Sequence, residues 1–238
     1  PVTHEKFGWS DDALLDEVQH LAEWPVGLLG EFAANYLDVP QEIIVTAMRT
    51  HQRYFAVENA LGRLANKFVT MMGTEVTDPT VVQRGNERVL AARLADAAFF
   101  FGEDQKHPLE ALNEKLRGVT FQAKLGDGAK TTFNKVERIV AIVTELAAKL
   151  PNAEANVATR AVMAARLCKA DLASGIVGEF PEIQGIMGGH YVRRTMASQL
   201  GEHTDVVAQA VEDHYRPKGQ GAELPQTTAG ALVALADR

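Results

Sequence analysis

Residues 166–191 read RLCKADLASGIVGEFPEIQGIMGGHY, and this stretch decides how the second part of the chain folds. Its first half continues a helical pattern, in which apolar or small side chains recur every three or four residues and lie on one helix face. Asp171 lies beside that face, so a carboxylate is expected at or near a core. Acids are rarely buried without a partner. The pattern therefore predicts that Asp171 is paired with another group in the folded chain.

Glycines then interrupt the same stretch, with Pro181 among them. A segment of this composition does not continue as one regular helix. It predicts an irregular turn that brings backbone close to another element and ends at His190 and Tyr191.

The composition is that of an ordinary globular protein, because 46% of the 238 residues are hydrophobic and 23% are charged. A net charge of -7 argues against a generally basic nucleic-acid binder but is compatible with a local basic face. The one cysteine, Cys168, fits a buried core residue and a reducing compartment, so we expect a cytoplasmic protein. No apolar run approaches the ~20 residues of a membrane span, and no membrane partner is expected.

The first part of the chain mixes helices and strands. Aromatic and β-branched runs on either side of an Asn- and Gly-bearing turn predict a hairpin. Ser10 is the expected cap of the first helix, and residues 27–37 fit a strand or a helix. The run Phe99, Phe100 and Phe101 predicts a core plug at a helix end. Helices are expected over 10–23, 40–50 and 78–101, and hairpin strands over 53–57 and 67–72.

From about Pro108 onward the patterns predict only helices. They cover 132–150, the helix that carries Asp171, 202–215 and 227–238, with a loop over 216–221. The expected fold class is therefore α+β, with a mixed α/β module over 1–112 followed by an all-helical domain over 113–238. The chain begins without Met and stops inside a helical pattern, so we take it for a fragment.

Several motifs together resemble the β subunit of bacterial glycyl-tRNA synthetase. They are RGNERVLAARLADAAFFF at 84–101, KADL at 169–172, EFPEIQGIMG at 179–188 and HYRP at 214–217, extended by THQRYFAV at 50–57 and VTFQAKLG at 119–126. The resemblance covers nearly the whole chain from Trp24.

The resemblance implies a heterotetrameric ligase of two α and two β subunits, which joins glycine to tRNA(Gly) with ATP. It places the chemistry on the α subunit and tRNA binding on β, so this chain would carry no catalytic residue and bind no cofactor. The implied partners are tRNA(Gly) and the α subunit, and not DNA. The chain would be an internal piece of β. Residues 1–112 resemble a module shared with the phenylalanyl-tRNA synthetase β subunit, and residues 113–238 resemble a truncated HD-type helical domain.

HD phosphohydrolases hold a metal with a His, a His-Asp pair and a distant Asp. The matching positions here are Lys135, Ala170-Asp171 and Asp237, so both imidazoles are missing and an ammonium group would repel a metal. We therefore expect no metal, and a structural charge cluster of Lys135, Asp171 and Asp237 in its place. In this hypothesis Lys135 neutralises Asp171 from the neighbouring helix and also helps to neutralise Asp237, although backbone amides are an alternative partner of Asp171.

Two other readings of this region stay open. A metal-dependent phosphohydrolase of HD type is the alternative function, with His190 or His214 as a further ligand. We interpret His214 instead as a histidine at a helix C-terminus that faces the helix dipole.

Basic residues gather between positions 115 and 138, where Asp127 and Glu137 are the only acids. Such an excess can meet RNA phosphate, although a solvated surface is the alternative interpretation. Phosphate-binding glycine motifs of the P-loop or dinucleotide-fold type are absent from the sequence. The candidate RNA-binding residues are Lys115, Arg117, Lys124, Lys130 and Arg138.

Overall fold

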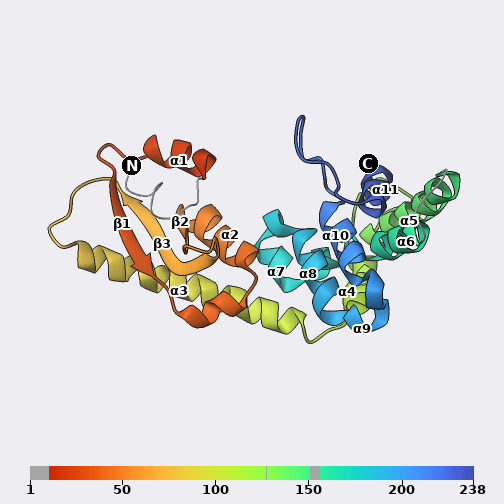
Figure 1. The fold of residues 1–238 in the computed structure, drawn as a ribbon, viewed down its shortest axis with the longest axis horizontal. Helices are drawn as coiled ribbons and strands as arrows, with labels where there is room; N and C mark the ends of the chain where they lie inside the picture. Colours follow the sequence, from red (N-terminus) through yellow and green to blue (C-terminus); the bar gives the residue numbers. More distant parts are fainter. Residues whose placement is uncertain (1–10, 127, 151–155) are drawn as a thin grey trace. The chain divides into compact units, whose positions relative to one another are not determined.

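A computed structural model describes residues 11–126, 128–150 and 156–238 of the chain (Figure 1). The chain forms two compact units, and the boundary between them lies between Phe101 and Gly102. The sequence places this boundary after Leu112, and the structure differs. Leu109 and Leu112 of α4 (Leu109–Lys115) are buried in unit 2, where α4 packs against the 3-10 helix η3 (Ala170–Ala173). The class is α+β, with mostly helical structure and one small sheet.

Unit 1 contains a three-stranded antiparallel sheet in the order β1-β3-β2. The expected hairpin is confirmed, since β2 (Phe55–Glu58) and β3 (Leu64–Met72) pair with Phe55 opposite Val69. The ambiguous segment 27–37 supplies both the edge strand β1 (Val26–Glu31) and the 3-10 helix η1 (Ala34–Asp38).

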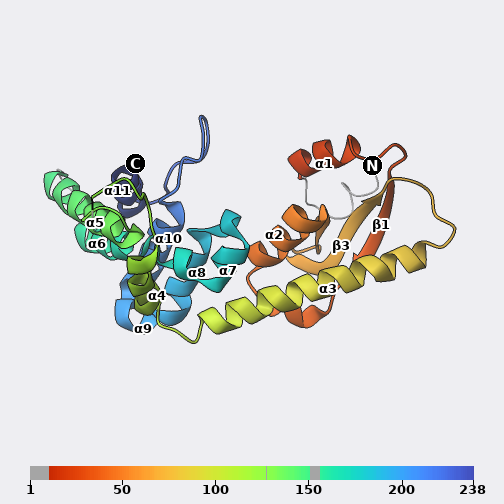
Figure 2. The same cartoon turned by 180° about the vertical axis from the view of Figure 1, so that it is seen from behind.

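The long helix α3 (Pro79–Asp104) runs across this sheet over its unit 1 portion (Figure 2). Leu90, Leu94 and Ala97 form its buried face, and the Tyr54 hydroxyl donates to Asn86 Oδ1 at 2.5 Å. The expected core plug is only partly present. Phe101 is buried, whereas Phe99 is 61% exposed, because the helix continues past the aromatic run and successive side chains point about 100° apart.

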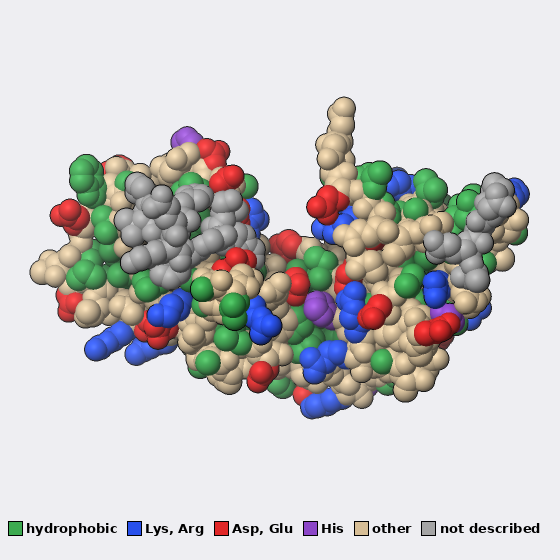
Figure 3. Space-filling view, viewed as in Figure 1, with side chains coloured by type: hydrophobic (Ala, Val, Ile, Leu, Met, Phe, Trp, Pro, Cys, Tyr) green, Lys and Arg blue, Asp and Glu red, His purple; other side chains and the backbone are tan. Residues whose placement is uncertain are grey.

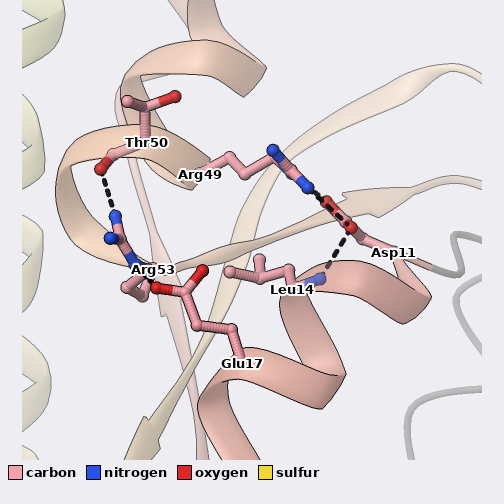
Figure 4. A network of polar contacts seen from close by, with 6 residues as sticks. All are labelled: Asp11, Leu14, Glu17, Arg49, Thr50 and Arg53. Carbon is pink, nitrogen blue, oxygen red and sulfur yellow. Dashed lines mark hydrogen bonds and ion pairs between the residues drawn. The ribbon is translucent and has the colours of Figure 1, made fainter. Parts of the chain in front are cut away.

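Helices α1 (Asp12–Gln19) and α2 (Gln41–Gln52) are joined by polar contacts (Figure 4). Asp11 accepts a hydrogen bond from the Leu14 amide at 2.9 Å and so caps α1, while Ser10 lies outside the described residues. Arg49 of α2 pairs with the same Asp11 carboxylate. Arg53 contacts Glu17 Oε1 at 2.5 Å and also donates to the Thr50 carbonyl.

Unit 2 is built from helices, and the only β pairing in its described part is an isolated bridge between Thr120 and Thr131. Thr131 and Asn134 form a capping box at the start of α5, and Thr227 caps α11. The remaining helices are α5 (Thr132–Lys149), α6 (Val157–Leu167), α7 (Gly175–Glu179), α8 (Ile186–Thr195), α9 (Ala197–Leu200), α10 (Thr204–Asp213) and α11 (Thr228–Asp237), with the 3-10 turns η2 (Leu116–Gly118), η4 (Pro181–Ile183) and η5 (Gly201–His203).

The stretch 166–191 differs from its expectation in two ways. The helix that was to carry Asp171 ends at Leu167, so Asp171 lies in η3. The expected turn holds only as far as Gly185, because Gly188, Gly189, His190 and Tyr191 are all helical residues of α8.

The two glycines of α8 allow α10 to approach closely. A Cβ on Gly188 would lie 2.7 Å from Val211 Cγ1, and one on Gly189 would lie 2.4 Å from Glu212 Cγ. The prediction that these glycines bring backbone close to another element is therefore confirmed.

Asp104, the last residue of α3, holds the start of α7 within unit 2. Its carboxylate accepts hydrogen bonds from the amides of Gly175 at 2.7 Å and Ile176 at 3.0 Å, and from the Tyr191 hydroxyl at 2.8 Å. Orphan amides at a helix N-terminus favour a negative charge there. One carboxylate thereby connects three helices.

Candidate functional site

A cluster of charged side chains lies between α5, α6 and α11. Lys135 Nζ lies 2.8 Å from Asp237 Oδ1, and Lys169 Nζ lies 2.7 Å from Asp237 Oδ2. Lys169 is 3% exposed at its side chain and Lys135 is 21% exposed. Burial would raise the pKa of Asp237, but attraction to Lys169, the hydrogen bond that Lys169 donates and the close contact with Lys135 outweigh burial and hold that pKa below its usual value.

Aromatic rings complete the surroundings of both ammonium groups. Lys169 Nζ lies 3.8 Å from the centre of the Tyr215 ring, and Lys135 Nζ lies 4.8 Å from that of Phe121. Such cation–π contacts favour the charged form of the lysine. Burial nevertheless lowers the pKa of Lys169 from its ordinary value.

His214 closes the buried side of the cluster as a neutral imidazole. Burial, and then the nearby Lys169, lower its pKa to about 3. Its Nδ1–H donates to the Val211 carbonyl at 2.5 Å, so Nε2 accepts from Lys169 Nζ at 2.9 Å. His214 does lie at the C-terminus of α10. It satisfies a helix carbonyl there by hydrogen bonding and not by carrying a charge.

Asp171 is held by backbone amides and not by Lys135. Its Oδ2 accepts from the amides of Gly185 at 2.5 Å and Gly188 at 3.0 Å, at the start of α8. Burial raises its pKa to about 6, although the two amide hydrogen bonds act in the opposite direction. Oδ1 has no hydrogen-bond partner among the described residues. The expected pairing of Asp171 with Lys135 is therefore wrong, because the carboxylate that contacts Lys135 is that of Asp237.

These residues do not fit a divalent cation. Ammonium groups contact both oxygens of Asp237, and backbone amides take the coordinating lone pairs of Asp171 Oδ2. No group of three or more His, Cys, Asp or Glu side chains converges on a metal position in the described part of the chain.

Lys169 is the member of this cluster that sequence reasoning missed. The comparison with HD enzymes directs attention to Ala170-Asp171 and passes over the adjacent lysine. A signal was present, because Lys169 follows the core residue Cys168 directly and lies next to Asp171. Cys168 itself is fully buried, its thiol donates to the Ala165 carbonyl at 3.3 Å, and burial raises its pKa to about 12.

The candidate RNA-binding residues fall into two groups. Arg117 pairs with Glu114 at 2.6 Å and stacks over the Phe133 ring, and Arg138 donates to the Ala129 carbonyl at 3.4 Å. Lys115, Lys124 and Lys130 are exposed, and none has an acidic partner within the described ranges. The face of the molecule drawn in Figure 3 carries acidic and basic side chains interspersed.

Comparison with known proteins gives a consistent result. The family model described as glycyl-tRNA synthetase beta subunit matches residues 5–238. Curated relatives named glycine–tRNA ligase beta subunit, from Trichlorobacter lovleyi, Geobacter metallireducens and Phenylobacterium zucineum, are 48%, 49% and 50% identical over 96% of this chain. The chain spans about a third of their length, 31% to 33%. Within the described residues, no helix has the length and apolar character needed to cross a membrane.

Proposed function

The chain belongs to the glycyl-tRNA synthetase β-subunit family, and on this basis we propose that it serves glycine–tRNA ligase as a tRNA-binding and scaffolding part. In this proposal the α subunit is its partner and performs the chemistry with ATP, while this chain binds no cofactor and contributes no catalytic residue. The complex works in the cytoplasm. The helical unit retains the outline of an HD-type domain whose metal position is taken by Lys135, Lys169 and Asp237.

One observation carries the proposal most directly. Lys115, Lys124 and Lys130 are exposed and have no acidic partner among the residues that the structure describes, in a chain whose net charge is -7. A lysine without an acidic partner can contact an external anion, and RNA phosphate is the anion that this family's partner presents. Arg117 and Arg138 take part less directly, because each already has a contact within the chain.

Titration of the chain with labelled tRNA(Gly), with and without the α subunit, tests this proposal. We expect binding that weakens steeply with salt, because phosphate contacts release counterions. Replacing both Lys124 and Lys130 by Glu should weaken binding and reduce the salt dependence. Lys218→Glu, another exposed lysine in unit 2, is the matched control. Equal affinity of the double variant and the control at low salt would remove the loop from the interface.

The same preparation tests the assignment of chemistry. We expect the purified chain alone to form no glycyl-tRNA from glycine, ATP and tRNA(Gly). Measurable charging without the α subunit would contradict the scaffolding role.

A further inference from the structure

The loop between η2 and α5 has a defined shape. Its ends are joined by the bridge between Thr120 and Thr131, and the amides of Phe121 and Gln122 donate to the Lys130 carbonyl at 2.9 and 3.2 Å. The Leu125 amide donates to the Gln122 carbonyl at 3.3 Å. These contacts fix Phe121 beside Lys130, with Lys124 in the same loop.

Phe121 is exposed and yet held in place. Phe121 is 45% exposed to solvent, and Lys135 Nζ lies 4.8 Å from the centre of its ring. Lys135 is itself fixed by Asp237, and Lys169 fixes the other oxygen of Asp237. The ring of Phe121 therefore packs against the ammonium group of Lys135, which the ion pair with Asp237 holds in place. The remaining surface of the ring is exposed to solvent.

An exposed aromatic ring next to unpaired lysines has a specific binding chemistry. Nucleobases stack on aromatic side chains irrespective of sequence, and lysines contact the phosphates on either side. A paired base inside a duplex cannot stack in this way, because both of its faces are covered by neighbouring base pairs. An apolar protein partner would meet the charges of Lys124 and Lys130, which this loop leaves without acids among the described residues.

We infer that Phe121 is a stacking platform for an unpaired RNA nucleotide, and that Lys124 and Lys130 hold the adjacent phosphates. This inference rests on the proposed RNA-binding function and specifies which part of the RNA binds to the protein loop between η2 and α5. The ligand is a single-stranded end or loop, and a base-paired stem contacts the same lysines through its phosphates alone.

Fluorescence anisotropy at low salt, with two RNA probes, tests the inference. One probe is a short blunt-ended RNA duplex without unpaired nucleotides, and the other is the same duplex with a 3′ tail of four adenosines. For Phe121→Leu we expect about tenfold weaker binding of the tailed duplex, which corresponds to the loss of one stacked base, and unchanged binding of the blunt one. Phe121→Tyr should bind both probes as the parent does, and Lys130→Gln should weaken both.

Phe99→Leu is the matched control, since Phe99 is an exposed aromatic residue of unit 1, and it should leave both affinities unchanged. If Lys130→Gln weakens binding but Phe121→Leu does not, the stacking role is wrong and RNA binding stands. If Phe121→Tyr is as weak as Phe121→Leu, the ring acts only by packing and the inference falls. If the parent chain binds neither probe nor tRNA(Gly), the proposed function falls as well.

Discussion

Asp237 shares its two carboxylate oxygens between two lysines of very different exposure. Lys169 lies in the interior against His214 and Tyr215, whereas Lys135 reaches Asp237 from the solvent side of the cluster. Ion pairs at a surface contribute little, but the removal of one member of a buried pair leaves an uncompensated charge. The two lysines should therefore differ in their effect on stability.

Lys169→Met tests the buried lysine and Lys135→Met is its control. We expect Lys169→Met to lower the free energy of unfolding by about 3 kcal/mol, because Asp237 and His214 both lose a buried partner. Lys135→Met should cost about 1 kcal/mol, since water can replace a partly exposed ammonium. Urea denaturation measures both. Equal losses would contradict the unequal burial of the two lysines.

A double-mutant cycle identifies the partner of Lys135. We expect coupling of about 1 kcal/mol or more between Lys135→Ala and Asp237→Asn, because these residues form an ion pair. Lys135→Ala and Asp171→Asn should instead be additive, since Asp171 is satisfied by the Gly185 and Gly188 amides. Coupling with Asp171 in place of Asp237 would restore the pairing expected from the sequence.

The low pKa of His214 makes a prediction about acid stability. The pKa of His214 is about 3 in the folded chain, because of burial and then Lys169, and about 6.5 in an unfolded one. Between these values the unfolded state binds the extra proton. The stability that a neutral His214 provides is therefore full above pH 6.5 and is lost as the pH falls, by roughly 1.4 kcal/mol per pH unit.

His214→Gln removes this titration, and urea denaturation between pH 7 and 4.5 measures it. The variant should be less stable than the parent at pH 7, and the difference should shrink as the pH falls. Asp171 acts in the opposite direction, since burial raises its folded pKa to about 6, but it titrates in both proteins and its effect cancels. A difference that is constant with pH would show that His214 is not a buried neutral group.

At the scale of elements, the sequence predicted best where periodicity acts alone. Helix α5 begins at Thr132 as expected, and the hairpin of β2 and β3 forms around its turn. Helix α8 was missed because glycine weakens a helix locally, whereas here Gly188 lets α10 pack against it. A local pattern cannot contain a contact with a segment some twenty residues later in the chain.

Gly188→Ala measures this helix contact, and Gly178→Ala is its control. An added methyl on Gly188 would lie 2.7 Å from Val211 Cγ1, so we expect a loss of about 2 kcal/mol from overpacking. Gly178 is also helical, but nothing lies within 4 Å of its added Cβ, so alanine there should be neutral or stabilising by up to about 1 kcal/mol. Thermal unfolding compares them. Equal effects would show that α8 and α10 can move apart freely.

The sequence predicted which residues form the charge cluster, except Lys169, but it did not predict which of them pair with one another. Lys135, Asp171 and Asp237 could be selected from their sequence positions, but partners depend on where α6 ends. Because α6 ends at Leu167, Asp171 turns toward the start of α8 and Lys169 occupies the space beside Asp237. Helix ends are the least certain feature of a sequence pattern, and here they decide which charge meets which.

For the whole molecule, each unit has its own buried side chains, such as Phe68 and Leu90 in unit 1 and Val143 and Val211 in unit 2. We expect residues 102–238 to fold alone and to unfold in one cooperative transition, followed by circular dichroism in urea. Asp104→Ala should destabilise this fragment by about 2 kcal/mol, because two amides and the Tyr191 hydroxyl lose their acceptor. A fragment without a cooperative transition would show that unit 2 depends on unit 1.

The burial of Cys168 makes the sulfur a reporter of opening events. A thiolate is the species that reacts with iodoacetamide, and a pKa of about 12 leaves almost none of it while the thiol stays enclosed. Alkylation then requires local opening of unit 2 around α6, so the alkylation rate measures how often the native protein opens there. Since the sequence contains one cysteine, every labelled molecule records the same event. Addition of tRNA(Gly) or the α subunit should slow the labelling to the extent that either partner binds the closed form more tightly.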